Sequence, residues 1–118
     1  MTRTITWMLS APLLAGLATA AIAQDDYPTK PITIIVPYGA GGGGDTVARL
    51  VSDKLSDELG VTINVENRPG AGGEIGITEM ANADPDGYTL GIFGYPDNFV
   101  AEATRDVGFN SAEDLLFL

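Results

Sequence analysis

A run of eight residues, 39–46, has the composition of an anion-binding loop. It reads Gly-Ala-Gly-Gly-Gly-Gly-Asp-Thr and lies between an apolar, β-branched run (32–36) and a segment with helical periodicity. A strand that delivers glycines to the first turn of a helix exposes backbone N–H groups, and the helix dipole adds partial positive charge there. The segment therefore predicts a site for an anion.

A second glycine loop, residues 70–73, reads Gly-Ala-Gly-Gly and follows the alternating, strand-like run 61–65. A small carboxylate needs only a few convergent N–H donors and one or two hydroxyl groups. Tyr38, Thr46 and Tyr95 are candidate hydroxyl donors. The alternative interpretation is that the glycines only permit tight turns, but two such loops at one edge of a sheet favour binding.

The first glycine loop also satisfies the dinucleotide-binding pattern G-x-G-x-x-G. Glu66 lies 22 residues beyond Gly44, where a ribose-binding acid belongs. A run this rich in glycine matches the pattern easily, however, and residues 37–38 separate the strand from the first glycine. No Lys-Ser/Thr pair follows, which disfavours a P-loop. An exported Rossmann-like nucleotide-binding enzyme fragment is therefore the alternative hypothesis.

The composition argues against catalysis and against a nucleic-acid partner. The 118 residues contain no Cys or His, and 6 Lys+Arg stand against 16 Asp+Glu, for a net charge of −10. Nucleophile–base pairs built on Cys or His are excluded, no G-x-S-x-G is present, and binding a phosphate backbone requires clustered Lys and Arg. Asp84 and Asp86 fit a turn, Asp-Pro-Asp-Gly. We therefore predict no enzyme activity, catalytic residue, metal, cofactor or nucleic-acid partner.

The periodicity predicts an α/β fold with a parallel sheet of strand order 2-1-3. We expect strands at 32–36, 61–65 and 88–93, crossover helices at 45–59 and 73–83, and a short helix near 99–104 with a turn from 111. Right-handed connections place both glycine loops and the loop 94–98 at the same edge of such a sheet.

Asp45 is the expected N-cap of the first helix, and Gly60 is its C-terminal glycine. The apolar stripe of this helix is expected at Val47, Ala48, Val51, Leu55 and Leu59. Arg49 is expected to pair with a neighbouring acid, and Arg68 to fix its loop. In the second helix Gly76 is a weakness of about 1 kcal/mol relative to alanine.

Residues 1–23 have the features of a secretory signal peptide. Arg3 gives a positive start, residues 5–17 are apolar, and residues 21–23 (Ala-Ile-Ala) fit the cleavage rule. A transmembrane anchor is the alternative, but Pro12 and the short apolar run disfavour it. With no Arg-Arg pair and no cysteine, the mature chain, 24–118, is expected to be soluble and periplasmic. Removing Arg3 changes its net charge from −10 to −11.

Three motifs resemble the receptors of tripartite tricarboxylate transporters, the extracytoplasmic solute-binding proteins of the Bug family. They are Pro37-Tyr38 with the glycine loop, Asp45 and Ala48-Arg49; VENRPGAGG at 65–73; and DPDGYTL at 84–90. The resemblance covers about residues 27–95, and the last two motifs form a specific pair. The tail, 107–118, is similar to the segment that leads into the next strand of the family.

The resemblance implies a periplasmic Venus-flytrap protein with two α/β lobes. Such a receptor captures a small carboxylate (a di- or tricarboxylate or similar organic acid) and passes it to membrane permease subunits. The loop after the first strand would hold the carboxylate, largely through backbone amides and ordered water. Transferred to this chain, the ligand-binding residues are Tyr38, Gly39, Ala40, Gly41, Gly42, Gly43, Gly44, Asp45, Thr46, Gly72, Gly73 and Tyr95.

The chain departs from the family pattern in two respects. Gly39 stands where a bulkier residue is common, and residues 24–118 correspond only to the N-terminal part of the first lobe, with the second lobe missing. We therefore expect either a fragment of a longer protein or a chain that needs a partner to complete its cleft.

Overall fold

The computed structural model describes residues 26–118, so the expected signal peptide at 1–23 lies outside the described residues. The elements are β1 (Ile32–Val36), α1 (Gly43–Leu59), β2 (Ile63–Asn67), the 3₁₀ turn η1 (Ala71–Gly73), α2 (Glu74–Ala81), β3 (Thr89–Gly91), α3 (Asp97–Thr104) and α4 (Ser111–Asp114). Between residues 26 and 118 no helix is both long and apolar enough to cross a membrane.

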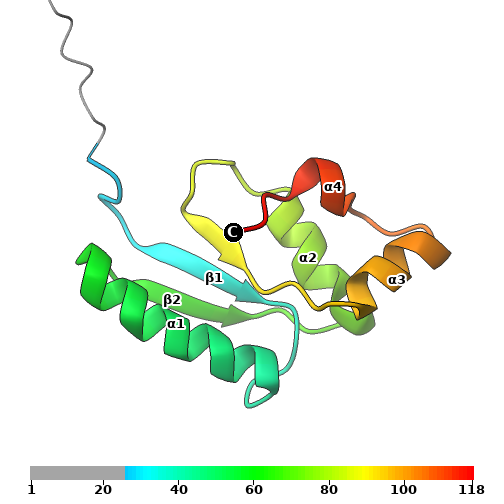
Figure 1. Cartoon of the computed structure of the whole chain (residues 1–118), viewed down its shortest axis with the longest axis horizontal. Coiled ribbons are helices and arrows are strands. Elements are labelled where there is room, and N and C mark those ends of the chain that lie inside the picture. The colour runs from blue at the N-terminus through cyan, green and yellow to red at the C-terminus, as the bar shows by residue number, and fades with distance from the viewer. Residues whose placement is uncertain (1–25) are drawn as a thin grey trace, which may run out of the picture.

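The strands form a parallel sheet of order β2-β1-β3, which confirms the predicted fold class and strand order. In the register, Ile34 of the central strand pairs with Val65 on one side and with Leu90 on the other. Helix α1 lies on one side of the sheet, and α2 with the following helices lies on the other (Figure 1). This arrangement follows from two right-handed crossovers that run in opposite directions across the sheet, from β1 to β2 and from β2 past β1 to β3.

The core lies on both faces of β1, whose nearly continuous apolar sequence suits a strand covered on both sides. Ile34 and Val36 pack against Ala48 of α1. Because side chains alternate along a strand, Ile35 faces the other layer, where Ile77 of α2 is completely buried. The buried β1 therefore fixes where the loop that follows it leaves the sheet.

The buried stripe of α1 agrees with the predicted one only in part, since Ala48 is buried and Leu55 packs against the core. Val47, Val51 and Leu59 are exposed, and the buried residues are Asp45, Ala48 and Ser52. These three residues have the same three- and four-residue spacing as the predicted stripe. Compared with the prediction, however, the helix is rotated about its axis, so that Asp45 and Ser52 are buried in place of Val47 and Val51. The small side chains of Ala48 and Ser52 face inward, and α1 ends as predicted with Gly60 in the left-handed conformation.

Helix α2 lies very close to the end of β1 at Gly76. A Cβ atom on Gly76 would lie 2.8 Å from the Cα atom of Pro37 and 2.9 Å from the carbonyl oxygen of Arg68. The glycine is therefore a packing requirement as well as the helix weakness that the sequence predicts. Helix α2 is shorter than predicted, Glu74–Ala81 in place of 73–83, and β3 covers only Thr89–Gly91 of the expected 88–93.

Candidate functional site

Three loops meet at the carboxyl edge of the sheet, as the sequence predicts. We call residues 37–42, 68–73 and 92–96 the edge loops, numbered 1 to 3. Gly73 of loop 2 lies against loop 1 and α3, because its Cβ would be 3.3 Å from Cε1 of Tyr38 and 3.1 Å from Nδ2 of Asn98. At Gly94 of loop 3, a Cβ would overlap the hydroxyl group of Tyr38.

Helix α1 begins with backbone N–H groups that lack a protein acceptor. Its N-cap is Gly42, which is extended (φ −79°, ψ 175°), and the N–H of Thr46 donates to the carbonyl oxygen of Gly42 at 2.9 Å. Across residues 26–118, the N–H groups of Gly43, Gly44 and Asp45 donate no hydrogen bond to a protein acceptor. Together with the helix dipole, these donors make the first turn of α1 suitable for an anion.

Asp45 is the third residue of α1, so the prediction that it is the N-cap is wrong. Its carboxylate folds back onto the protein and accepts from the N–H of Gly41 at 2.8 Å, from Nε of Arg49 at 3.0 Å and from Nδ2 of Asn67 at 3.0 Å. These donors, with Arg49 the largest cause, lower the pKa of Asp45 from 3.8 to about 2. The buried carboxylate therefore fixes the shape of loop 1 against α1 and β2.

Replacing Asp45 with asparagine is expected to change the acid stability of the protein. Because the native pKa lies below the ordinary value of 3.8, the carboxylate stabilises the fold above about pH 4, and this contribution is lost as the pH falls towards 2. Asp45→Asn should therefore be less stable at neutral pH and should lose less further stability in acid. Urea unfolding over this pH range measures the difference. Asp53→Asn, on the exposed surface of α1, is the matched control, and a profile of Asp45→Asn parallel to that of the wild type would contradict the assignment.

Loop 2 is held in a conformation that glycine makes accessible. Residues 70–73 all have positive φ angles, including Ala71 at 48°, where a side chain is disfavoured. Arg105 of the loop after α3 donates to the carbonyl oxygen of Ala71 at 3.2 Å and pairs with Glu74 at 3.3 Å. Loop 2 is therefore fixed both by its own backbone and by a side chain that reaches it from the residue after α3.

The three candidate hydroxyl groups have different surroundings. Tyr38 donates to Oδ1 of Asn98 at 2.7 Å, and burial, followed by the nearby Asp97, raises the pKa of Tyr38. Thr46 donates to the carbonyl oxygen of its own helix N-cap at 3.0 Å. Tyr95 is 82% exposed. The structure thus brings Tyr38 and Thr46 to the edge with their O–H groups committed to the protein, and leaves Tyr95 at the surface.

Two asparagines that were not predicted from the sequence organise the edge. Asn67, the last residue of β2, donates to the carbonyl oxygen of Tyr38 at 3.1 Å as well as to Asp45. Asn98, in the first turn of α3, is only 1% exposed. The position of Asn67 just beyond the predicted strand 61–65, which the structure places at Ile63–Asn67, was a usable signal, because that position lies at the carboxyl edge of the sheet. The sequence places the loop 94–98 at this edge, but nothing in it marked the side chain of Asn98 as a bridge between loops.

The basic side chains near the edge are already paired with acids. Of the five Lys and Arg between residues 26 and 118, four form ion pairs. Arg49 pairs with Asp45, which confirms the predicted pairing. Arg68, which was predicted only to fix its loop, pairs with Glu66 at 2.5 Å and with Glu79 at 3.0 Å. Glu66, the acid that a dinucleotide site would use, is thus bound to Arg68. Binding of an anion at this edge would therefore rely on backbone N–H groups and not on Lys or Arg side chains.

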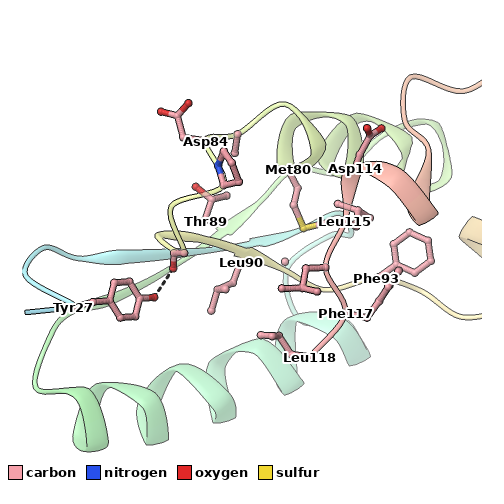
Figure 2. A pocket seen from close by; sticks show the side chains of 15 residues that line it. Tyr27, Met80, Asp84, Thr89, Leu90, Phe93, Asp114, Leu115, Phe117 and Leu118 are labelled. Atoms are coloured by element: carbon pink, nitrogen blue, oxygen red, sulfur yellow. Dashed lines mark hydrogen bonds between the residues drawn. The ribbon is translucent and has the colours of Figure 1, made fainter. Parts of the chain in front are cut away.

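Two cavities in residues 26–118 lie mainly outside the edge loops, and Phe93 of loop 3 lines one of them. The larger, about 560 Å³, runs along β3 and is partly lined by the apolar residues 115–118. Figure 2 shows Leu115, Phe117 and Leu118 on its wall, with the hydrogen bond from the Tyr27 hydroxyl to the Gly87 carbonyl oxygen nearby. The other, about 520 Å³, lies near Tyr27 and Tyr88. Neither of these two cavities is lined by loop 1 or loop 2.

The comparisons with known proteins agree on one family. The sequence model of the tripartite tricarboxylate transporter family receptors matches residues 47–118. This match includes loops 2 and 3 and begins just after the glycine run of loop 1. A curated relative from Agrobacterium vitis, the UPF0065 protein in the TAR-I ttuE-ttuC' intergenic region, is 50% identical over 91 residues, which are 77% of this chain and 25% of the relative.

Two solved structures of similar proteins extend this comparison. The periplasmic binding protein BugD is 48% identical with a TM-score of 0.53, over 55% of this chain and 22% of that one. MatC from Rhodopseudomonas palustris, solved with bound malate, is 45% identical with a TM-score of 0.53, also over 55% of this chain and 22% of that one. The chain spans about a quarter to a third of the length of the curated relatives that it matches.

Proposed function

Because the chain belongs to the tripartite tricarboxylate transporter receptor family, we propose that it forms part of the binding site of a receptor for a small carboxylate. The observation that carries this proposal is the set of N–H groups of Gly43, Gly44 and Asp45, which have no protein acceptor within residues 26–118. A carboxylate oxygen accepts such charge-assisted hydrogen bonds well. The malate bound to MatC is a carboxylate of this class.

The proposed binding surface contains the twelve residues identified from the sequence, in five roles. The first turn of α1 donates hydrogen bonds to the carboxylate, and residues 39–42 shape the approach to it. Gly72 and Gly73 form a neighbouring wall, and Tyr95 supplies an exposed hydroxyl group. Tyr38, Asp45 and Thr46 keep loop 1 in place through their bonds to the protein.

We also propose a cellular setting for this receptor. Residues 1–23 direct export, the mature chain acts in the periplasm, and the ligand passes to permease subunits in the membrane. Since the matched relatives are about four times longer than their aligned parts, a second lobe closes over the ligand in the complete receptor. The acid that is bound depends on that lobe as well as on the edge loops.

A titration followed by NMR tests the proposed function in the 118-residue chain. Malate and adipate, added to millimolar concentrations, are expected to shift the backbone amide signals of Gly43, Gly44 and Asp45. The neutral diamide of malate is the matched control, because it has a similar shape and no charge, and should leave these signals in place. NAD is the competing probe. Shifts with NAD alone would favour the nucleotide hypothesis and contradict the carboxylate receptor.

A further inference from the structure

Asn98 occupies a position between all three edge loops. It lies in the first turn of α3 (Asp97–Thr104) and is 1% exposed. Its Oδ1 atom accepts from the hydroxyl of Tyr38 in loop 1 and from the N–H of Gly94 in loop 3, both at 2.7 Å. Its Nδ2 atom donates to the carbonyl oxygen of Gly72 in loop 2 at 3.4 Å. One side-chain amide thus bonds to each loop.

The surroundings of this amide leave no room for larger neighbours. A Cβ on Gly94 would lie 2.7 Å from Oδ1 of Asn98, and one on Gly73 would lie 3.1 Å from its Nδ2 atom. Two glycines of the edge loops therefore lie against the two polar atoms of one buried side chain. An apolar side chain of similar size would fill the same volume, but it would leave a buried hydroxyl and N–H without partners.

We propose that Asn98 is a positioning residue, which holds the three edge loops in one arrangement so that the first turn of α1 and loop 2 face the same ligand. This inference rests on the proposed carboxylate site. It assigns no ligand contact to Asn98, whose amide acts through Tyr38, Gly72 and Gly94. A loop that is ordered before binding pays less ordering entropy when the ligand arrives, so loss of the amide lowers the fraction of binding-competent protein.

Three variants separate positioning from general stability. Asn98→Ala removes all three bonds, and Tyr38→Phe removes only the bond to loop 1 if the first variant folds poorly. Asn110→Ala is the matched control: Asn110 caps α4 by accepting from the N–H of Ala112 at 3.1 Å, and its loss lowers stability without touching the edge loops. Amide hydrogen exchange without ligand and malate affinity by NMR are measured for each.

The positioning role predicts that both edge variants speed amide exchange at Gly72 and Gly94 relative to the control. If the competent fraction falls to about a tenth, malate affinity falls about tenfold in Asn98→Ala, and Asn110→Ala keeps the wild-type affinity. Equal affinity and exchange in all variants would overturn the positioning role alone. If wild-type protein binds neither malate nor adipate, the proposed function fails and the positioning role fails with it.

Discussion

Replacing Gly76 with alanine is expected to destabilise the protein, although alanine is the better helix former. The helix propensity favours alanine by about 1 kcal/mol. The new Cβ, however, would lie 2.8 Å from the Cα of Pro37 and 2.9 Å from the carbonyl oxygen of Arg68, and neither backbone atom can rotate away. Overpacking of this kind costs about 1–3 kcal/mol, so the net effect is a loss of stability. Thermal unfolding should show a midpoint lower by about 4–8 °C for each net kcal/mol lost in a domain of this size.

The control for this experiment is Gly43→Ala in α1. No atom lies within 4 Å of a Cβ at Gly43, so the substitution adds helix propensity without a clash. Its unfolding midpoint should stay the same or rise, while that of Gly76→Ala falls. A rise in both variants would mean that α2 does not approach the end of β1 as closely as the structure shows.

Much of the fold followed from short-range features of the sequence. The run 32–36 is apolar and β-branched, and it forms the buried central strand with the predicted bounds. Gly60 ends α1 because a left-handed residue is needed there and glycine adopts that conformation without a steric penalty. The strand order followed from the alternation of strands and helices and from the handedness of the crossovers. Each of these features depends on local chemistry or on a general rule of chain topology.

The rotation of α1 and the role of Gly76 did not follow from the sequence. Hydrophobic periodicity gives the angle between two residues on a helix, but not which of two overlapping stripes faces the sheet. The stripe with Asp45, Ala48 and Ser52 is the buried one, because the Asp45 carboxylate is hydrogen-bonded to Asn67 of β2. Contacts between distant segments decide both the rotation of α1 and the need for glycine at position 76, and such contacts produce no periodic pattern in the sequence.

In the candidate site, too, the features set by local sequence were predictable and those set by contacts between distant residues were not. Its place at the edge of the sheet was predictable, because every loop that follows a parallel strand lies there. The side chains that hold the loops together were not. Asn98 bonds to residues 4, 26 and 60 positions away, so only the assembled fold reveals its role.

Replacing Gly43 with proline tests the backbone N–H that the proposed function requires. Gly43 is the first residue of α1, where proline is well tolerated because its N–H has no partner in the helix. The preceding Gly42 is already extended (φ −79°, ψ 175°), as a residue before proline prefers. The variant should therefore fold like the wild type but lack one donor to the carboxylate. Loss of a hydrogen bond to a charged group costs about 1.5–3 kcal/mol, so malate affinity measured by NMR titration should fall about 10- to 150-fold.

Gly43→Ala again provides the control, because alanine changes the side chain and keeps the N–H. It should bind malate with nearly the wild-type affinity, while Gly43→Pro binds weakly and unfolds at a similar temperature. Equal weakening in both variants would mean that the open space around Gly43, and not its N–H, is what the ligand needs. Unchanged binding in both would remove the first turn of α1 from the proposed site. The pair therefore assigns the interaction to a single hydrogen atom of the backbone, because proline lacks that atom and alanine retains it.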